Sequence, residues 1–66
     1  MIGELVSYDR RRNHGFVEGD GARVFVHSSE LRRAGIRRPV NGMALKFESG
    51  LRDGREVAIK ILELKS

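Results

Sequence analysis

Residues 13–29 read Asn-His-Gly-Phe-Val-Glu-Gly-Asp-Gly-Ala-Arg-Val-Phe-Val-His-Ser-Ser, and this stretch decides the expected fold. Its centre, residues 18–21, is a turn sequence, because glycine tolerates positive φ and aspartate bonds to its own backbone. Polar and apolar residues alternate on both sides of the turn, as in strands whose side chains point to opposite faces in succession. The stretch therefore predicts a β-hairpin.

The two faces of this hairpin differ in chemistry. The second arm places Phe25 and His27 on one face, and the first arm places His14 and Phe16 together in the same way, while the valines fall opposite. The aliphatic face is explained as core, but rings directed into solvent indicate a binding surface. Because nucleic-acid bases stack on such rings, the hairpin points to a nucleic-acid partner.

Length and composition bound the class of protein. The chain has 66 residues, which predicts a single domain over residues 1–66 whose one core barely suffices for stability. It contains no cysteine, so disulfides and thiolate metal sites are excluded, and we expect a cytoplasmic location. No apolar run approaches the ~20 residues of a membrane span, and no leader pattern precedes the first strand pattern. We therefore expect a mature protein with no membrane partner.

The charge is basic and dominated by arginine. There are 13 lysines and arginines against 9 acidic residues, and ten of the 13 are arginine. A guanidinium group can grip phosphate through two hydrogen bonds and can also stack on a base. This bias favours a polyanionic partner over a charged shell that serves only solubility or heat resistance.

Alternation and turn residues predict an all-β chain. The expected strands are Ile2–Tyr8, His14–Glu18, Arg23–Ser28, Met43–Glu48 and Val57–Leu62. Between the third and fourth we expect a long loop with one helical turn at 30–33, capped by Ser28 or Ser29 and ended by Gly35. Asn41-Gly42 predicts a turn, and 50–55 predicts a loop with Asp53-Gly54 at its tip.

Five short strands of this kind predict a closed, five-stranded antiparallel barrel, because closure removes the edges that an open sheet would expose. The expected core residues are Leu5, Val17, Val24, Val26, Leu31, Leu45, Phe47, Ile59 and Ile61. At about 1.5–3 kcal/mol for each buried apolar side chain, this core offsets the chain entropy only narrowly. We expect marginal stability.

At Gly15-Phe16-Val17 and Val24-Phe25-Val26-His27 the chain resembles the cold-shock domain, a five-stranded OB-fold barrel. The family pattern can be laid on nearly the whole chain without gaps. Tyr8 takes the place of the first aromatic residue of the pattern, and Arg12 that of the lysine in its first ribonucleoprotein motif. Further matches are Gly3, Asp9, Ser29, Leu31, Gly35 and Gly42. The resemblance implies a barrel that binds unpaired nucleic acid on a platform of aromatic rings.

The departures from the pattern reduce this platform. Ser7 stands in the position of a tryptophan, Ser28 in that of a phenylalanine and Ile36 in that of an aromatic residue. Further departures are Val6 for lysine, Asn13 for glycine and His14 for phenylalanine. The rings that are left should hold about two or three bases. We expect weaker and less pyrimidine-selective binding than in the family, with arginine carrying more of the affinity.

The expected ligand is single-stranded RNA or single-stranded DNA, bound by a monomer. The candidate binding residues are Tyr8, Arg10, Arg11, Arg12, His14, Phe16, Phe25, His27, Arg37 and Arg38. We expect no catalytic residues, because neither paired carboxylates nor a metal-ligand spacing accompany the two histidines. No phosphate-binding loop is present, so we expect neither a cofactor nor a small-molecule substrate.

Three functions fit the sequence. The first is an RNA chaperone that holds strands open without ATP, through preferential binding to unpaired bases. The second is a small barrel that serves as a protein-interaction or ribosome-associated module, which the losses at Ser7, Ser28 and Ile36 favour. The third is another OB-type translation factor, such as bacterial initiation factor one. The Val-Phe-Val-His motif argues against this third function.

Overall fold

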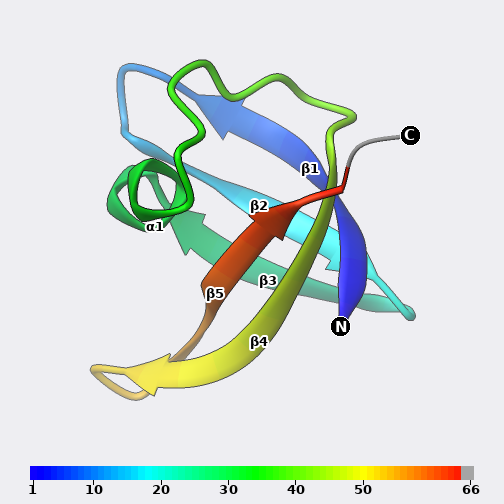
Figure 1. Cartoon of the computed structure of the whole chain (residues 1–66). Coiled ribbons are helices and arrows are strands. Elements are labelled where there is room, and N and C mark those ends of the chain that lie inside the picture. The colour runs from blue at the N-terminus through cyan, green and yellow to red at the C-terminus, as the bar shows by residue number, and fades with distance from the viewer. Residues whose placement is uncertain (65–66) are drawn as a thin grey trace.

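Five strands close into a barrel in the order β1-β2-β3-β5-β4 in a computed structural model that describes residues 1–64 (Figure 1). The elements are β1 (Ile2–Asp9), β2 (His14–Gly19), β3 (Ala22–His27), α1 (Ser28–Arg33), β4 (Ala44–Arg52) and β5 (Arg55–Glu63). The all-β barrel expected from the sequence is confirmed, as is the long connection between its third and fourth strands. α1 and the loop after it form that connection.

The expected hairpin of β2 and β3 forms. Phe16 faces Phe25 across the pair, and His14 faces His27. The chain reverses at Asp20-Gly21, where both residues have positive φ, 52° and 74°. Such a pair of left-handed residues matches the twist of the strands it joins, which explains the Asp-Gly sequence.

The barrel closes through one parallel pair. β3 and β5 run parallel where Phe25 faces Val57, whereas the other strand pairs are antiparallel. The pairing is therefore mixed rather than entirely antiparallel. The parallel pair is possible because the long connection through α1, the strand β4 and the turn after it separate β3 from β5 in the sequence.

The hairpin of β4 and β5 is longer than the sequence predicted. The expected loop over 50–55 is wrong, because the strand ladder continues to the pair Arg52–Arg55. Only Asp53 and Gly54 turn the chain, with φ of 54° and 76°. The tip of this hairpin projects away from the barrel (Figure 1).

The core contains all but one of the expected residues. The side chains predicted to be buried in β1 to β4, α1 and at Ile61 are buried, and Phe47 is the largest of those fully enclosed. Ile59 is the exception, since it is only half-buried, while its neighbours Val57 and Ala58 are both buried. The reason is a bulge in β5 at Lys60, whose φ is 50° and which breaks the alternation of faces.

β1 carries a similar bulge. Its register against β2 shifts between Val6 and Asp9, and Ser7 has a φ of 52°. An extra residue at this point bends the strand and changes the direction of the side chains that follow. The bulge therefore turns Tyr8 toward the core, against which it packs half-buried.

The short helix α1 lies against β3 and β5 (Figure 1). Its N-cap is His27, whose Nδ1 accepts a hydrogen bond from the main-chain N–H of Ser29, so the expected serine cap is wrong. Gly35, with a φ of 81°, ends the helix as expected. The Ile36 N–H donates to the Leu31 carbonyl and the Gly35 N–H to the Arg32 carbonyl, which is a Schellman motif.

Candidate nucleic-acid interface

Three rings gather on the outer face of β2 and β3. The centroids of His14 and Phe25 lie 5.2 Å apart, and those of Phe16 and Phe25 lie 6.0 Å apart in an edge-to-face arrangement. They border a hollow of about 580 Å³, which we call the ring hollow and which is lined by His14, Phe16, Arg23, Phe25, Arg55 and Glu56. Both phenylalanines are half-buried, so part of each remains in contact with solvent.

The register of the sheet produces this cluster. Phe16 and Phe25 are direct partners across β2 and β3, and both alternate with valines that are fully inside the barrel. Gly15 lies between the two ring residues of β2, His14 and Phe16, and an added Cβ at this position would lie 2.7 Å from the Cα of Tyr8. Glycine thus allows β1 to approach β2 closely beneath the ring-bearing face.

Two guanidinium groups lie over the phenylalanine rings. The Cζ of Arg23 is 4.9 Å from the ring centroid of Phe16, and the Cζ of Arg55 is 4.7 Å from that of Phe25. Arg23 also pairs with Glu18 at 3.5 Å, and its Nη2 donates to the Ser7 hydroxyl at 3.2 Å. The two distances from Cζ to a ring centroid, 4.9 and 4.7 Å, are those of cation–π contacts.

Neither of these arginines was among the candidate residues from the sequence. Arg23 shares the outer face of β3 with Phe25, so the alternation of faces that predicts Phe25 on this face predicts Arg23 there as well. Arg55 had no such local signal, because it reaches Phe25 only through the parallel pairing of β5 with β3. Ser7, which occupies the tryptophan position of the resemblance, accepts a hydrogen bond from Arg23 and so holds it beside the ring hollow.

The two histidines face each other across β2 and β3 but differ in their bonding. Nδ1 of His14 lies 3.1 Å from the Arg12 carbonyl oxygen, which can only accept, so a hydrogen bond here requires the tautomer with a proton on Nδ1. His27 Nδ1 accepts from the Ser29 N–H, which can only donate. The exposed His27 ring therefore combines its position on the ring-bearing face with a structural role as the helix cap.

Tyr8 lies apart from the ring hollow, because the bulge at Ser7 directs it against the core. Its main-chain N–H donates to Asn41 Oδ1 at 2.9 Å, which ties the end of β1 to the long connection. Its ring is half-buried.

The arginines of the turn after β1 and of the long connection are exposed. Arg12 pairs with Asp9 at 3.9 Å, and the Asp9 carboxylate also accepts from the Arg11 main-chain N–H. Arg10 and Arg38 are brought together, as they line a shared hollow of about 460 Å³ with Pro39 and Val40. Arg37 is exposed in the same connection. The hollow that Arg10 and Arg38 share places the turn after β1 beside the long connection.

Two of the positions at which the resemblance expected rings are internal. Ser28 is 9% exposed at the start of α1, and Ile36 is 5% exposed in the core. The Schellman motif accounts for Ile36, because this motif packs the residue after the terminal glycine against the last turn, here Leu31. The ring-bearing surface is accordingly limited to the side chains of β2 and β3.

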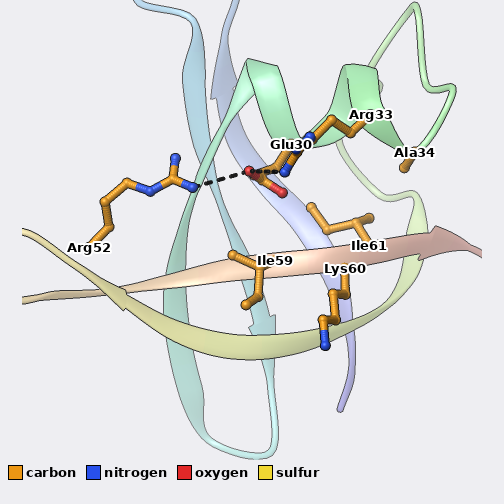
Figure 2. A pocket seen from close by; sticks show the side chains of 7 residues that line it. All are labelled: Glu30, Arg33, Ala34, Arg52, Ile59, Lys60 and Ile61. Atoms are coloured by element: carbon orange, nitrogen blue, oxygen red, sulfur yellow. Dashed lines mark hydrogen bonds and ion pairs between the residues drawn. The ribbon is translucent and has the colours of Figure 1, made fainter.

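A separate feature is the buried carboxylate of Glu30 on α1. Its side chain is 7% exposed and pairs with Arg33 at 3.8 Å and with Arg52 at 3.4 Å (Figure 2). A charge at this depth is tolerable only when it is paired, and the two guanidinium groups fulfil that condition. The ion pairs also connect α1 to β4.

In the described part of the chain, no helix is long and apolar enough to cross a membrane. Residues 1–64 also contain no group of three histidine, aspartate or glutamate side chains placed to hold a metal ion. A comparison with models of known protein families finds no family that matches this chain.

Proposed function

We propose that this barrel binds single-stranded RNA or DNA by stacking unpaired bases against Phe16 and Phe25. The observation that carries the proposal is the outward ring cluster with two arginines laid over it. Aromatic rings that face a hollow, bordered by guanidinium groups, offer a base a flat surface and offer its phosphate a cation. The sequence resemblance to the cold-shock domain supports the same function.

The arginines over the rings do not prevent stacking. An exposed cation–π contact contributes about 0.5–1 kcal/mol, whereas a stacked base contributes about 1–3 kcal/mol for each ring. A base that displaces Arg55 from Phe25 therefore gains free energy, and the displaced guanidinium can bind the adjacent phosphate. Arg23 can be displaced from Phe16 in the same way, at the added cost of its contacts with Glu18 and Ser7.

With two phenylalanines and one or two histidines, the platform takes about two or three bases. Contacts of this number are weak and exchange rapidly, which suits a protein that traps transiently open strands and needs no ATP. Preferential binding to the unpaired state shifts the equilibrium away from RNA secondary structure by mass action. The specific role that we propose is that of an RNA chaperone.

A second candidate is a protein-interaction module. Ser28 and Ile36 are internal, so the platform lacks rings there, and Ile2 and Leu62 are 59% and 58% exposed on strands that both pair with β4. A protein partner could use these apolar side chains. Under this alternative, homopolymer oligonucleotides of every base would fail to bind at low salt.

The salt dependence of binding tests the electrostatic part of the proposal. If the exposed arginines engage about five phosphates of a single strand, log K plotted against the logarithm of salt concentration should have a slope of about −3 to −4. Fluorescence anisotropy with labelled oligo-U and oligo-dT at several salt concentrations measures this slope. A slope shallower than about −1 would contradict the phosphate contacts.

A further inference from the structure

Three hollows follow one another from the rings to α1, each sharing lining residues with the next. The ring hollow and its neighbour, of about 350 Å³, share Phe25 and Arg55. This second hollow and a third, of about 270 Å³ beside α1, share Arg52. Arg52 and Arg55 are themselves partners at the end of the β4–β5 ladder.

We propose that a bound single strand leaves the ring hollow over the β4–β5 hairpin, with its phosphates on Arg55, Arg52 and Arg33. We call this series the arginine track. The inference depends on the proposed function and adds the direction of the strand and binding residues outside the rings. It differs from the sequence-based expectation, which placed the phosphates on Arg10 to Arg12, Arg32, Arg37 and Arg38.

The exposure of the groups favours phosphate on this track. The side chains of Arg33 and Arg52 are 79% and 55% exposed, whereas the carboxylate that lies between them and that they share is only 7% exposed (Figure 2). Each approaches Glu30 through one terminal nitrogen, Nη1 of Arg33 and Nη2 of Arg52. A guanidinium has five N–H donors, so most of them are available to an approaching phosphate.

Glu30 therefore acts as a positioning residue for the track. Its carboxylate holds the guanidinium groups of Arg33, on α1, and Arg52, on β4, on either side of it (Figure 2). A side chain that is already ordered loses less entropy when it binds its ligand. The lining of the third hollow is partly apolar, because the bulge at Lys60 turns Ile59 away from the core and into this lining.

Asp53 opposes phosphate at the middle of the track, since it lines the second hollow. Removing the charge of Asp53 should therefore strengthen binding, whereas removing the charge of a track arginine should weaken it. Asp53 has a φ of 54°, and asparagine accepts this left-handed conformation, so Asp53→Asn removes the charge without straining the turn. Asp20, with a φ of 52°, occupies the equivalent position in the β2–β3 turn, and Asp20→Asn is the matched control.

The experiment compares two lengths of oligo-dT, about three nucleotides to occupy the rings alone and about nine to extend beyond them within the ~4–16 that one OB barrel engages. Wild type should bind the longer oligomer more tightly. Arg52→Gln should weaken the longer oligomer about two- to fivefold, as expected for one exposed charge pair, and Asp53→Asn should strengthen it by a similar factor. All three variants should bind the shorter oligomer as tightly as wild type. Asp20→Asn should also bind the longer oligomer as tightly as wild type.

The outcomes separate the track from the proposed function. A wild type that binds neither oligomer overturns both. A wild type that binds, combined with Arg52→Gln and Asp53→Asn variants that leave the longer oligomer unaffected, overturns the track alone, and a lowered melting temperature of Arg52→Gln would then assign Arg52 only to holding α1. If Asp20→Asn and not Asp53→Asn changes the affinity for the longer oligomer, the nucleic acid leaves the ring hollow over the β2–β3 turn, and the arginine track is wrong.

Discussion

Replacing Phe16 and Phe25 together by alanine is expected to reduce the affinity for unpaired oligonucleotides by at least about 30-fold. A stacked base is worth about 1–3 kcal/mol for each ring, so the two rings together contribute about 2–6 kcal/mol. The barrel should stay folded, because both rings lie on its outer face and the core valines beside them are unchanged. Anisotropy with labelled oligo-dT measures the affinity, and circular dichroism checks the fold.

The matched control removes two other large apolar side chains from the surface. Ile2→Ala with Leu62→Ala alters residues that are 59% and 58% exposed on β1 and β5. This pair should leave oligonucleotide affinity within about twofold of wild type, since exposed apolar residues away from the site contribute little. If instead the Phe16→Ala, Phe25→Ala protein binds as tightly as wild type, bases do not stack on these rings.

Phe47→Ala is expected to have the largest effect on stability. Phe47 is 1% exposed and is the largest fully buried side chain, so truncation should cost about 3–5 kcal/mol. A chain of 66 residues has a total stability of about 3–10 kcal/mol at typical values per residue. The variant should therefore be largely unfolded or close to it at room temperature, and chemical denaturation followed by circular dichroism measures the change.

Ile59→Ala provides the comparison within the same barrel. The sequence predicts Ile59 as a core residue, yet the bulge at Lys60 leaves it half-buried beside α1. Its truncation should cost about 1 kcal/mol or less, because the side chain is partly in water before the change. A loss of stability as large as that of Phe47→Ala would place Ile59 in the core after all.

The parts of the fold that follow from local sequence were predictable. Alternation around Asp20-Gly21 gives the β2–β3 hairpin, Gly35 gives the end of α1, and Asn41-Gly42 gives the turn before β4. The bulges at Ser7 and Lys60 were not, since serine and lysine carry no preference for positive φ. These residues adopt it because closing a barrel bends the strands, which is a property of the whole sheet.

The same distinction applies to the candidate site. The shared face of His14, Phe16 and Phe25 follows from the period of a strand, and the structure brings these three together. Tyr8 could not be placed without the bulge that turns it toward the core. Arg55 required the parallel pairing of β3 and β5, which joins residues from distant parts of the chain.

The central claim is that unpaired bases stack on the outer face of β2 and β3. Heteronuclear NMR of the labelled protein, titrated with oligo-dT at low salt, tests it most directly. The account predicts that the ring signals of Phe16 and Phe25 and the guanidinium signals of Arg23 and Arg55 shift with added oligomer, while the amides of Ile2 and Leu62 do not. Unchanged ring signals at a saturating oligomer concentration, or shifts confined to the surface of Ile2 and Leu62, would contradict it.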